Sequence, residues 1–402
     1  MLHVAGGVYR EYCLHPSWRE VYGSAGRSAS AIMQIGGQVT LHTYLESSNA
    51  EVLQSRAALE GFILNATYVE ESVSFSYQHA LSIPTIRVPL LKYGPLKLSE
   101  DKVIRFGMIE GNAIIDAGFA VYDPQNVQSP EGFHDNGSRA AHLAVVLNRH
   151  EASTMSGLIG ASPEDMAPKI ASQSGAEVVI IKMGARGALV YEAGSFSLVP
   201  AFRTDRVWKI GSGDNFVAHF GYHWMEKGLP SVEAAALASK ATAYYCANQG
   251  FATPKHLAAF SPPEIRLSAR FLKGYKPIVY LAGPFFTLAD LWLVEQARNN
   301  LREMGLRVFS PYHDVGHGSA DDVVELDLKG VRDCDVVLAI GDGLDSGTIY
   351  EVGYARAIEK PVIFYSENES YDDKKMMIGS GCVLCNDYVT AIYKTLWLAA
   401  EQ

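Results

Sequence analysis

Two carboxylates near the start of a predicted helix could do chemistry. Residues 341–355 read GDGLDSGTIYEVGYA and follow the apolar run Val336–Ile340, which indicates a buried parallel strand ending at a turn. Asp345 and Glu351 would then lie in the first turns of a helix at the carboxyl end of a parallel strand, where open α/β sheets bind ligands. The alternative is that Asp345 only caps the helix and Glu351 only interacts with the helix dipole.

A glycine turn could do a second kind of chemistry. Residues 211–214 read GSGD and open a predicted helix at Asp214–Lys227. Small residues let backbone N–H groups approach an anion, and a helix N-terminus favours negative charge. Asp214 could take a proton from an attacking hydroxyl while these N–H groups hold the transferring phosphoryl group. The alternative is a plain glycine turn with an aspartate in the first helical turn.

Composition limits the class of protein around these groups. The 402 residues are 48% hydrophobic and 19% charged, which is typical of a soluble globular protein of two or three domains. A net charge of −10 argues against a nucleic-acid partner. We find no signal peptide and no apolar run long enough for a membrane span. Five cysteines, an odd and sparse set, predict a reducing compartment and hence a cytoplasmic protein.

Three smaller groups of residues have open interpretations. Cys382 and Cys385 form one C-x-x-C, but a zinc site normally needs a second pair, so incidental buried thiols are favoured. His313, Asp314 and His317 could suggest a metal, whereas the neighbouring glycines favour a mobile substrate loop. The turn at residues 379–381 (GSG) could hold a phosphate or be a plain loop.

The chain predicts two α/β domains. Residues 1–255 alternate strand-like and helix-like patterns, except that residues 66–91 are rich in β-formers and indicate an antiparallel flap. Residues 256–276 contain Ser-Pro-Pro, lose this alternation and form a predicted linker. Residues 277–402 alternate again, which predicts a doubly wound parallel sheet. In that sheet Tyr280 and Asp327 could converge with Glu351 at one edge.

Three segments of the second domain carry a family resemblance. YLAGPFF (280–286), DLKGVRDCDVVLAI (327–340) and DSGTIYEVGYA (345–355) resemble the nucleoside 2-deoxyribosyltransferase family in order and spacing. The resemblance spans about residues 276–395 and implies a flavodoxin-like fold, nucleoside or nucleoside 5'-monophosphate substrates and a homo-oligomer. It also implies glycosyl transfer to a second base, or hydrolysis by water. The site residues that it implies are Glu351 as nucleophile, Asp345 at the sugar hydroxyls, Asp327 as proton donor to the base, Tyr280 orienting the nucleophile, and Gly283, Ser346 and Gly347 as substrate contacts.

The first domain resembles another family. Asn148-Arg149-His150-Glu151, the run from Lys182 to Ala188 and the GSGD turn follow one another as in the ribokinase-like (PfkB) kinases, and the 66–91 flap resembles their lid. The resemblance spans about residues 1–255 and implies a ribokinase-like fold, ATP, Mg²⁺ and a sugar or nucleoside acceptor. The site residues that it implies are Asp214 as catalytic base, Gly211, Ser212 and Gly213 in an anion hole, Asn148 and Glu151 beside phosphate and Mg²⁺ with Glu151 as metal ligand, and Gly184 and Gly187 at the nucleotide pocket.

The acceptor side departs from that family. Glu11 stands where a sugar-binding aspartate is expected, and Arg27 replaces an asparagine. Arg27 could meet a carboxylate or phosphate on the substrate, or mark a lost sugar site. The leading hypothesis is therefore a bifunctional enzyme that joins N-glycosidic cleavage to phosphorylation. The alternative is a nucleotide-cleaving glycosidase with a silent kinase-like sensor or oligomerisation domain.

Overall fold

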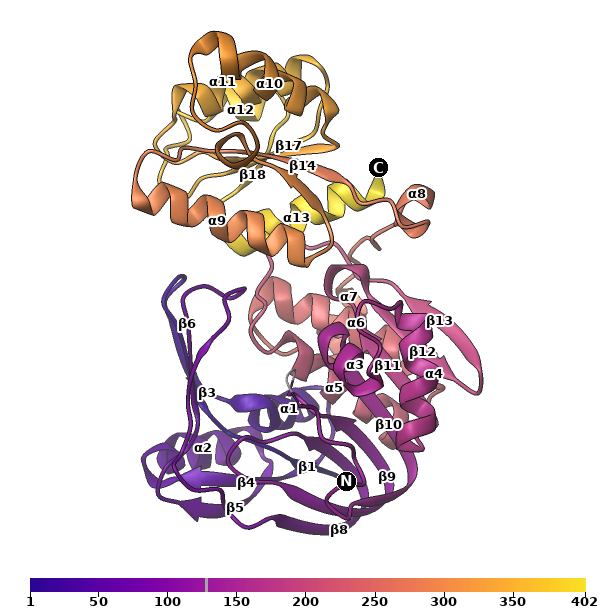
Figure 1. Ribbon diagram of the computed structural model, residues 1–402. Helices are drawn as coiled ribbons and strands as arrows, with labels where there is room; N and C mark the ends of the chain where they lie inside the picture. The colour runs from indigo at the N-terminus through magenta and orange to yellow at the C-terminus, as the bar shows by residue number, and fades with distance from the viewer. Residues whose placement is uncertain (127–128) are drawn as a thin grey trace. The chain divides into compact units, whose positions relative to one another are not determined.

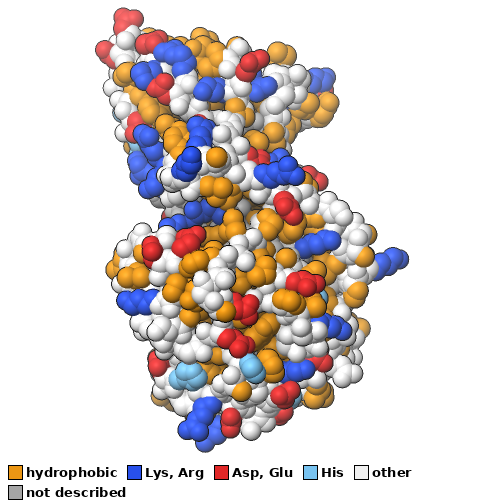
Figure 2. Space-filling view, turned by 90° about the vertical axis from the view of Figure 1, so that its right-hand side faces the viewer, with side chains coloured by type: hydrophobic (Ala, Val, Ile, Leu, Met, Phe, Trp, Pro, Cys, Tyr) orange, Lys and Arg blue, Asp and Glu red, His pale blue; other side chains and the backbone are white. Residues whose placement is uncertain are grey.

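The computed structural model describes residues 1–126 and 129–402 and divides into two compact units, Met1–Glu264 and Ile265–Gln402 (Figure 1). The division falls within residues 256–276, and two short helices lie in or beside that segment, α7 (Pro254–Ala259) and α8 (Ala269–Leu272). In the described part of the chain, no helix is both long and apolar enough to cross a membrane. The face shown in Figure 2 intersperses acidic, basic and apolar side chains.

The first unit is built on a nine-stranded sheet with the order β13-β12-β11-β10-β9-β8-β1-β4-β5. Neighbouring strands from β5 through β11 are parallel, and β12 and β13 are antiparallel additions at one edge. The strands are β1 (Leu2–Ala5), β4 (Val39–Glu46), β5 (Ile63–Val69), β8 (Leu96–Phe106), β9 (Ala113–Asp123), β10 (Arg139–Asn148), β11 (Val178–Lys182), β12 (Ala188–Glu192) and β13 (Ser195–Val199).

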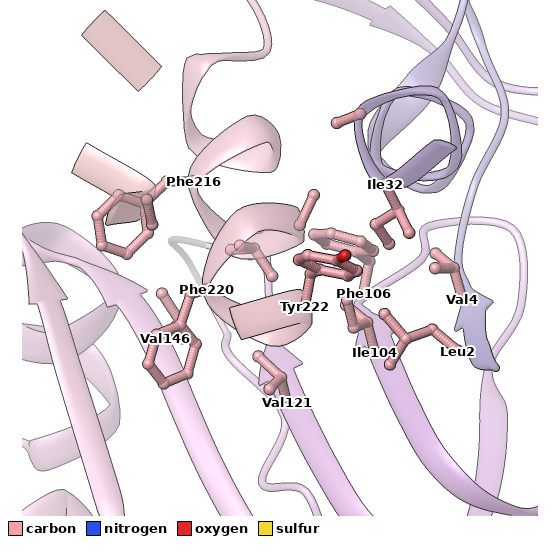
Figure 3. Close-up of a cluster of buried hydrophobic side chains, with 14 of the residues drawn as sticks. Leu2, Val4, Ile32, Ile104, Phe106, Val121, Val146, Phe216, Phe220 and Tyr222 are labelled. Carbon is pink, nitrogen blue, oxygen red and sulfur yellow. The ribbon is translucent and has the colours of Figure 1, made fainter. Parts of the chain in front are cut away.

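Helices cover both faces of this sheet because successive side chains of each strand point to opposite faces. Leu2 and Val4 of β1 pack in the core that also contains Phe220 and Tyr222 (Figure 3). Ala5 packs in the core on the other face. Burying one such large apolar side chain stabilises the fold by about 1.5–3 kcal/mol. The first face carries α1 (Gly23–Gln34), α2 (Ser47–Glu60), α5 (Ser212–Gly221), a π-helical turn (Tyr222–Glu226) and α6 (Ser231–Asn248), and the second carries α3 (Arg149–Ser156) and α4 (Pro163–Ser174).

A separate four-stranded sheet, here called the small sheet, has the order β3-β2-β6-β7. Its strands are β2 (Arg10–Cys13), β3 (Trp18–Val21), β6 (Ser74–Tyr77) and β7 (Thr85–Arg87). The prediction of a flap at 66–91 is therefore wrong in extent, because half of the small sheet comes from residues 10–21 and residues 66–69 belong to β5. It is also not purely antiparallel, since β2 and β6 pair in parallel. Period-2 alternation identifies a strand but does not say which sheet receives it.

The second unit contains a five-stranded, wholly parallel sheet with the order β15-β14-β16-β17-β18. Numbered within the unit this order is 2-1-3-4-5, that of flavodoxin-like doubly wound sheets, which confirms the predicted fold class. The strands are β14 (Ile278–Ala282), β15 (Arg307–Phe309), β16 (Val336–Ile340), β17 (Val362–Tyr365) and β18 (Val383–Cys385).

The helices of the second unit lie on two sides of its sheet (Figure 1). One core joins Tyr280, Val337 and Phe364 to residues of α10, α11 and α12, so the Tyr280 side chain points to that side. On the other side α13 packs on β16 and β17, and α9 packs on β15. The helices are α9 (Leu288–Glu303), α10 (Ala320–Asp333), α11 (Ser346–Ala357), α12 (Lys375–Gly379) and α13 (Tyr388–Glu401).

The two ends of the second unit meet. The backbone N–H of Ser268 donates to the carbonyl oxygen of Ala400 at 2.9 Å, and that of Arg266 donates to Glu401 Oε1 at 3.3 Å. The residues that enter the unit are thus fastened to the last turn of α13, most of which is buried.

Candidate active sites

Glu351 and Tyr280 meet at the carboxyl edge of the second sheet. The Tyr280 hydroxyl on β14 donates a hydrogen bond of 2.6 Å to Glu351 Oε1 on α11, although the two residues are 71 positions apart. Tyr280 is fully buried and its ring stacks on Phe309 of β15, with centroids 5.4 Å apart. A rigid, buried donor therefore fixes the orientation of a carboxylate that lies in the second turn of its helix.

The surroundings of Glu351 change its proton affinity. Burial raises the pKa of Glu351 to about 7, nearby Asp327 and Asp345 add to the rise, and the hydrogen bond from Tyr280 opposes it. Burial and the neighbouring Glu351 carboxylate also raise the pKa of Tyr280, which stays a neutral donor. A carboxylate with one short hydrogen bond and no cation among its named partners retains electron density for attack on an electrophile.

Asp345 caps α11. Its Oδ2 accepts hydrogen bonds from the Thr348 backbone N–H at 2.8 Å and from Thr348 Oγ1 at 3.0 Å. The turn before it is tight: Gly343 and Leu344 both have positive φ, 82° and 47°. Positive φ is uncommon for a leucine and indicates a constrained turn. The cap thus uses one carboxylate oxygen of Asp345, and the charge of Asp345 adds to the raised pKa of Glu351.

Asp327, which lies on α10, is the third carboxyl group of this site beside Glu351 and Asp345. Its Oδ1 is buried without a hydrogen-bond partner, and burial raises the pKa of its carboxyl group. Its charge contributes to the raised pKa of Glu351, so the two carboxyl groups are electrostatic neighbours. A half-buried carboxyl group with an unpartnered oxygen and a raised pKa has the properties of a proton donor.

Three further predicted residues lie at the same edge. Gly283 follows β14, and a Cβ there would lie 3.1 Å from Ile340 Cβ, so a side chain would crowd the end of β16. Ser346 and Gly347 form the exposed first turn of α11. The turn at residues 379–381 ends α12 and precedes β18, so it lies at the opposite, amino edge of the sheet, where the Ser380 carbonyl accepts a hydrogen bond of 2.8 Å from Arg356 Nε. His313 bonds to Glu295 Oε1 at 2.6 Å.

Asp214 of the first unit has different partners. Its Oδ2 forms an ion pair of 2.7 Å with Arg27 Nη1, and its Oδ1 accepts a hydrogen bond of 2.8 Å from Gln125 Nε2. Arg27 Nη2 also lies 2.5 Å from Glu11 Oε2. Both carboxylate oxygens of the predicted base are thus already hydrogen-bonded within the chain. Glu11, predicted as a substrate contact, binds Arg27 instead.

Arg27 is 1% exposed. Burial alone would lower the pKa of the Arg27 guanidinium, but Glu11, Tyr245 and Asp214 together raise it above its ordinary value. Burial also raises the pKa of the Glu11 carboxyl group, and the Arg27 charge partly opposes this. Removing one member of such a buried network leaves an uncompensated charge, which is strongly unfavourable.

The glycine turn forms the N-terminus of a helix, as predicted, but the N–H of Ser212 is bonded within the chain. Gly211 is the N-cap of α5 with φ of 78°, a conformation that favours glycine. The N–H of Ser212 donates to the Lys209 carbonyl at 3.1 Å, and Lys209 Nζ donates to Ser212 Oγ at 2.8 Å. Ser212 therefore does not offer its N–H to an anion in this conformation. The first N–H groups of a helix have no partner within it, which leaves those of Gly213 and Asp214 for this role.

Asn148 and Glu151 form a capping box at the start of α3. Glu151 N–H donates to Asn148 Oδ1 at 2.9 Å, and Asn148 N–H donates to Glu151 Oε2 at 2.8 Å. Burial raises the pKa of Glu151 to about 7, and the charge of Asp123 adds to the rise. Asp123 pairs with Lys182 Nζ at 2.6 Å.

Asp123, Gln125 and Lys182 were not predicted as site residues. Asp123 ends β9 and Lys182 ends β11, so both lie at the same sheet edge as Asn148 of β10. The Asp-Pro pair that ends a long apolar strand was the signal in the sequence. Gly184 and Gly187, with φ of 60° and 87°, shape the turn that joins β11 to β12. A Cβ at Gly187 would lie 2.0 Å from the Val199 carbonyl oxygen.

Comparisons with known proteins agree with this architecture. Residues 279–382 match the family model of the nucleoside 2-deoxyribosyltransferases, and residues 124–257 match that of the pfkB family carbohydrate kinases. Both predicted resemblances are confirmed. The chain joins a ribokinase-like kinase domain to a domain of the nucleoside 2-deoxyribosyltransferase family. Among curated proteins, none matches the chain.

Two solved structures have folds similar to the first unit. A nucleoside kinase of Methanocaldococcus jannaschii, an archaeal member of the ribokinase family, is 13% identical with a TM-score of 0.50 and covers 64% of this chain and 96% of its own. A fructokinase of Vibrio cholerae O395, in a form with bound fructose, ADP and calcium ion, is 14% identical with a TM-score of 0.50 and covers 64% of this chain and 98% of its own. These similarities show the ribokinase-like fold.

Proposed function

We propose that the second unit cleaves the N-glycosidic bond of a nucleoside or nucleoside 5'-monophosphate through Glu351. The observation that carries the proposal is the 2.6 Å hydrogen bond that orients Glu351 from the buried Tyr280 hydroxyl. The match of this unit to the nucleoside 2-deoxyribosyltransferase family supports the substrate class. With a pKa of about 7, Glu351 is substantially ionised at neutral pH and can act as a nucleophile.

The proposed reaction has two halves. In the first, a Glu351 carboxylate oxygen bonds to the anomeric carbon, the bond from that carbon to the base nitrogen breaks, and Asp327 donates a proton to the leaving base. The carboxylate also stabilises the positive charge that develops on the sugar ring. In the second half, water or another base attacks the anomeric carbon, the bond from that carbon to Glu351 breaks, and the proton that the attacking group loses returns to Asp327. Asp345 would bind the sugar hydroxyls with its remaining oxygen, beside Gly283, Ser346 and Gly347.

Base release tests this assignment. Incubation of the full chain with nucleosides and their 5'-monophosphates should release free base, measured by chromatography. Glu351→Ala should reduce the rate roughly 10³-fold or more, because the covalent step is lost. Asp333→Asn is a matched control, since Asp333 is exposed and pairs with Lys329 on α10. Base release that survives Glu351→Ala unchanged would refute the nucleophile.

A second free base in the same reaction separates transfer from hydrolysis. Formation of a new nucleoside indicates a transferase, and release of free sugar indicates a hydrolase. The family resemblance also leads us to propose a homo-oligomer, which light scattering of the purified chain would test.

For the first unit we propose ATP-dependent phosphorylation of a sugar or nucleoside hydroxyl. Asp214 would accept the hydroxyl proton, and the N–H groups of Gly213 and Asp214 would hold the phosphoryl group. Glu151 fits a Mg²⁺ ion because such an ion needs only one or two carboxylates beside the phosphates of ATP. The positive charge of the ion would also favour the ionised form of Glu151, whose pKa is raised by burial and by the charge of Asp123. When bound, Mg²⁺ neutralises phosphate charge. Gly184 and Gly187 would line the nucleotide pocket.

A silent kinase-like sensor or oligomerisation domain is the second candidate for the first unit. The observation in its favour is the ion pair between Arg27 and the proposed base Asp214. ATP consumption with a panel of sugars and nucleosides, compared with Asp214→Asn, separates the two. Acceptor-dependent turnover that requires Asp214 supports the kinase, and its absence under every condition supports the silent domain.

A further inference from the structure

One buried network links three elements of the first unit. Glu11 lies on β2 of the small sheet, Arg27 lies on α1, and Asp214 lies in the first turn of α5. Arg27 Nη2 lies 2.5 Å from Glu11 Oε2, and Arg27 Nη1 lies 2.7 Å from Asp214 Oδ2. All three residues are buried, since Arg27 is 1% exposed, Glu11 5% and Asp214 8%. A charge pair that solvent cannot reach resists separation much more than a surface pair does. The small sheet is therefore tied to the helix that carries the proposed base.

Arg27 also fills space beside the glycine turn. A Cβ built on Gly211 would lie 2.0 Å from Arg27 Nε, so the guanidinium packs directly on the turn. Tyr245 accepts a hydrogen bond of 3.2 Å from Nε, and the Tyr22 ring lies 5.3 Å from the guanidinium carbon. Packing on several sides holds the guanidinium in this position.

An acceptor hydroxyl must come within hydrogen-bond distance of the base that removes its proton. Arg27 Nη1 holds that position at Asp214 Oδ2, and Gln125 Nε2 holds the other oxygen. In this conformation both carboxylate oxygens of Asp214 are occupied within the chain, so neither is open to an acceptor hydroxyl.

We propose that the Glu11–Arg27–Asp214 network is an autoinhibitory latch, in which Arg27 takes the acceptor's place and Glu11 ties the small sheet to it. The proposal rests on the proposed kinase function of the first unit. Separation of β2 from the core withdraws Glu11 and leaves Arg27 bonded to Asp214, Tyr245 and the Gly23 carbonyl. Movement of Arg27 away from Asp214 then opens the acceptor side. The chain would accordingly bind nucleotide but phosphorylate neutral sugars or nucleosides slowly while the latch is closed.

The test compares three variants of the full chain. The double variant Glu11→Gln with Arg27→Gln replaces the ion pair by two amides, which can bond to each other and leave no unpaired buried cation. Glu11→Gln alone releases the small sheet but keeps Arg27 at Asp214. Arg56→Gln is the matched control, because Arg56 of α2 ties β3 to the core through Glu20 at 2.9 Å and contacts the Tyr22 ring, but bonds to no member of the Glu11–Arg27–Asp214 network.

Two readouts are measured for each variant. Hydrogen exchange of peptides that contain residues 10–13 reports opening of the small sheet, and ATP consumption with ribose, fructose or adenosine reports phosphotransfer. We expect faster exchange of β2 in both Glu11 variants and not in Arg56→Gln. We expect acceptor-dependent turnover to rise roughly 10²-fold in the double variant only, because a buried charge pair no longer has to open.

The outcomes separate the latch from the kinase function. Faster β2 exchange without turnover in the double variant keeps the latch and rejects phosphotransfer by the first unit. Exchange of β2 that matches the control in both Glu11 variants overturns the latch. Wild-type turnover with neutral acceptors as fast as that of the double variant also overturns it.

Discussion

Glu351 and Asp214 both lie in the first two turns of a helix, but their partners differ. The partner of Glu351 is a neutral hydroxyl, and burial raises its pKa to about 7. Asp214 is bonded by a guanidinium and an amide, which occupy both of its oxygens. The position of a carboxylate on a fold thus does not decide its use. A neutral donor orients a carboxylate and leaves it reactive, whereas a buried cation makes it part of the scaffold.

Loss of the cation should produce the largest effect on stability. Arg27→Gln leaves Glu11 and Asp214 without their counter-charge and should lower the free energy of unfolding by about 3–5 kcal/mol. Scanning calorimetry of the full chain measures this. Arg56→Gln, which breaks a more exposed pair, should lower it by about 1 kcal/mol or less. Equal losses in the two variants would contradict a special structural role for the Arg27 network.

Loss of the Tyr280 hydroxyl, the neutral donor to Glu351, should change the rate of base release rather than the stability of the fold. Tyr280→Phe removes the hydrogen bond that lowers the pKa of Glu351, so the midpoint of the pH–rate profile should shift to higher pH. Base release at pH 7 should fall about tenfold to a hundredfold, in line with the strength of a hydrogen bond to a charged group. An unchanged midpoint would show that Tyr280 does not control ionisation of Glu351.

Because the pKa of Glu351 is raised, replacing this residue should increase the free energy of unfolding by an amount that depends on pH. Its folded-state pKa of about 7 exceeds its ordinary value of 4.5, so the carboxyl group favours the folded state below the ordinary value and loses that contribution as pH rises through 7. Glu351→Gln should therefore stabilise the chain by about 1–3 kcal/mol at pH 8 and have little effect at pH 4. Thermal unfolding at both values measures it, and a loss of stability at pH 8 would contradict the burial argument.

Substitutions of Asp345 should give the smallest change in stability. They also test whether Asp345 only caps the helix, an alternative that the sequence left open. Asp345→Ala removes the cap of α11 and should cost about 1 kcal/mol, whereas Asp345→Asn keeps an acceptor oxygen and should cost a few tenths. If Asp345 also binds the sugar hydroxyls, both variants lower kcat/KM for base release. Wild-type kinetics in Asp345→Asn would reduce Asp345 to a helix cap.

The sequence predicted the second unit well because its signals are local. The apolar run Val336–Ile340 forms a strand with the predicted bounds. Parallel strands share one carboxyl edge, so the approach of Tyr280 to Glu351 followed from the order of elements. The capping of α11 by Asp345 followed from residue type alone.

The first unit was harder to predict because its decisive contacts are distant. Arg27 and Asp214 are 187 positions apart, and nothing in either local sequence indicates the pair. Arg27 was interpreted either as a contact for a carboxylate or phosphate of the substrate or as the mark of a lost sugar site, and neither interpretation includes a pair within the chain. The role of Gln125 at Asp214 and of residues 10–21 in the small sheet likewise depends on tertiary packing, which overrides local β preference.

The contacts of Ser268 with Ala400 and of Arg266 with Glu401 have an evolutionary consequence. A module whose entry and exit are adjacent can be inserted, appended or permuted without rearranging its core. Recombination at the two ends of the unit, beside residues 265 and 402, would transfer it to another protein without cutting its core. The same closure makes its gene segment portable in the laboratory, where transplantation onto an unrelated carrier should preserve the arrangement around Glu351.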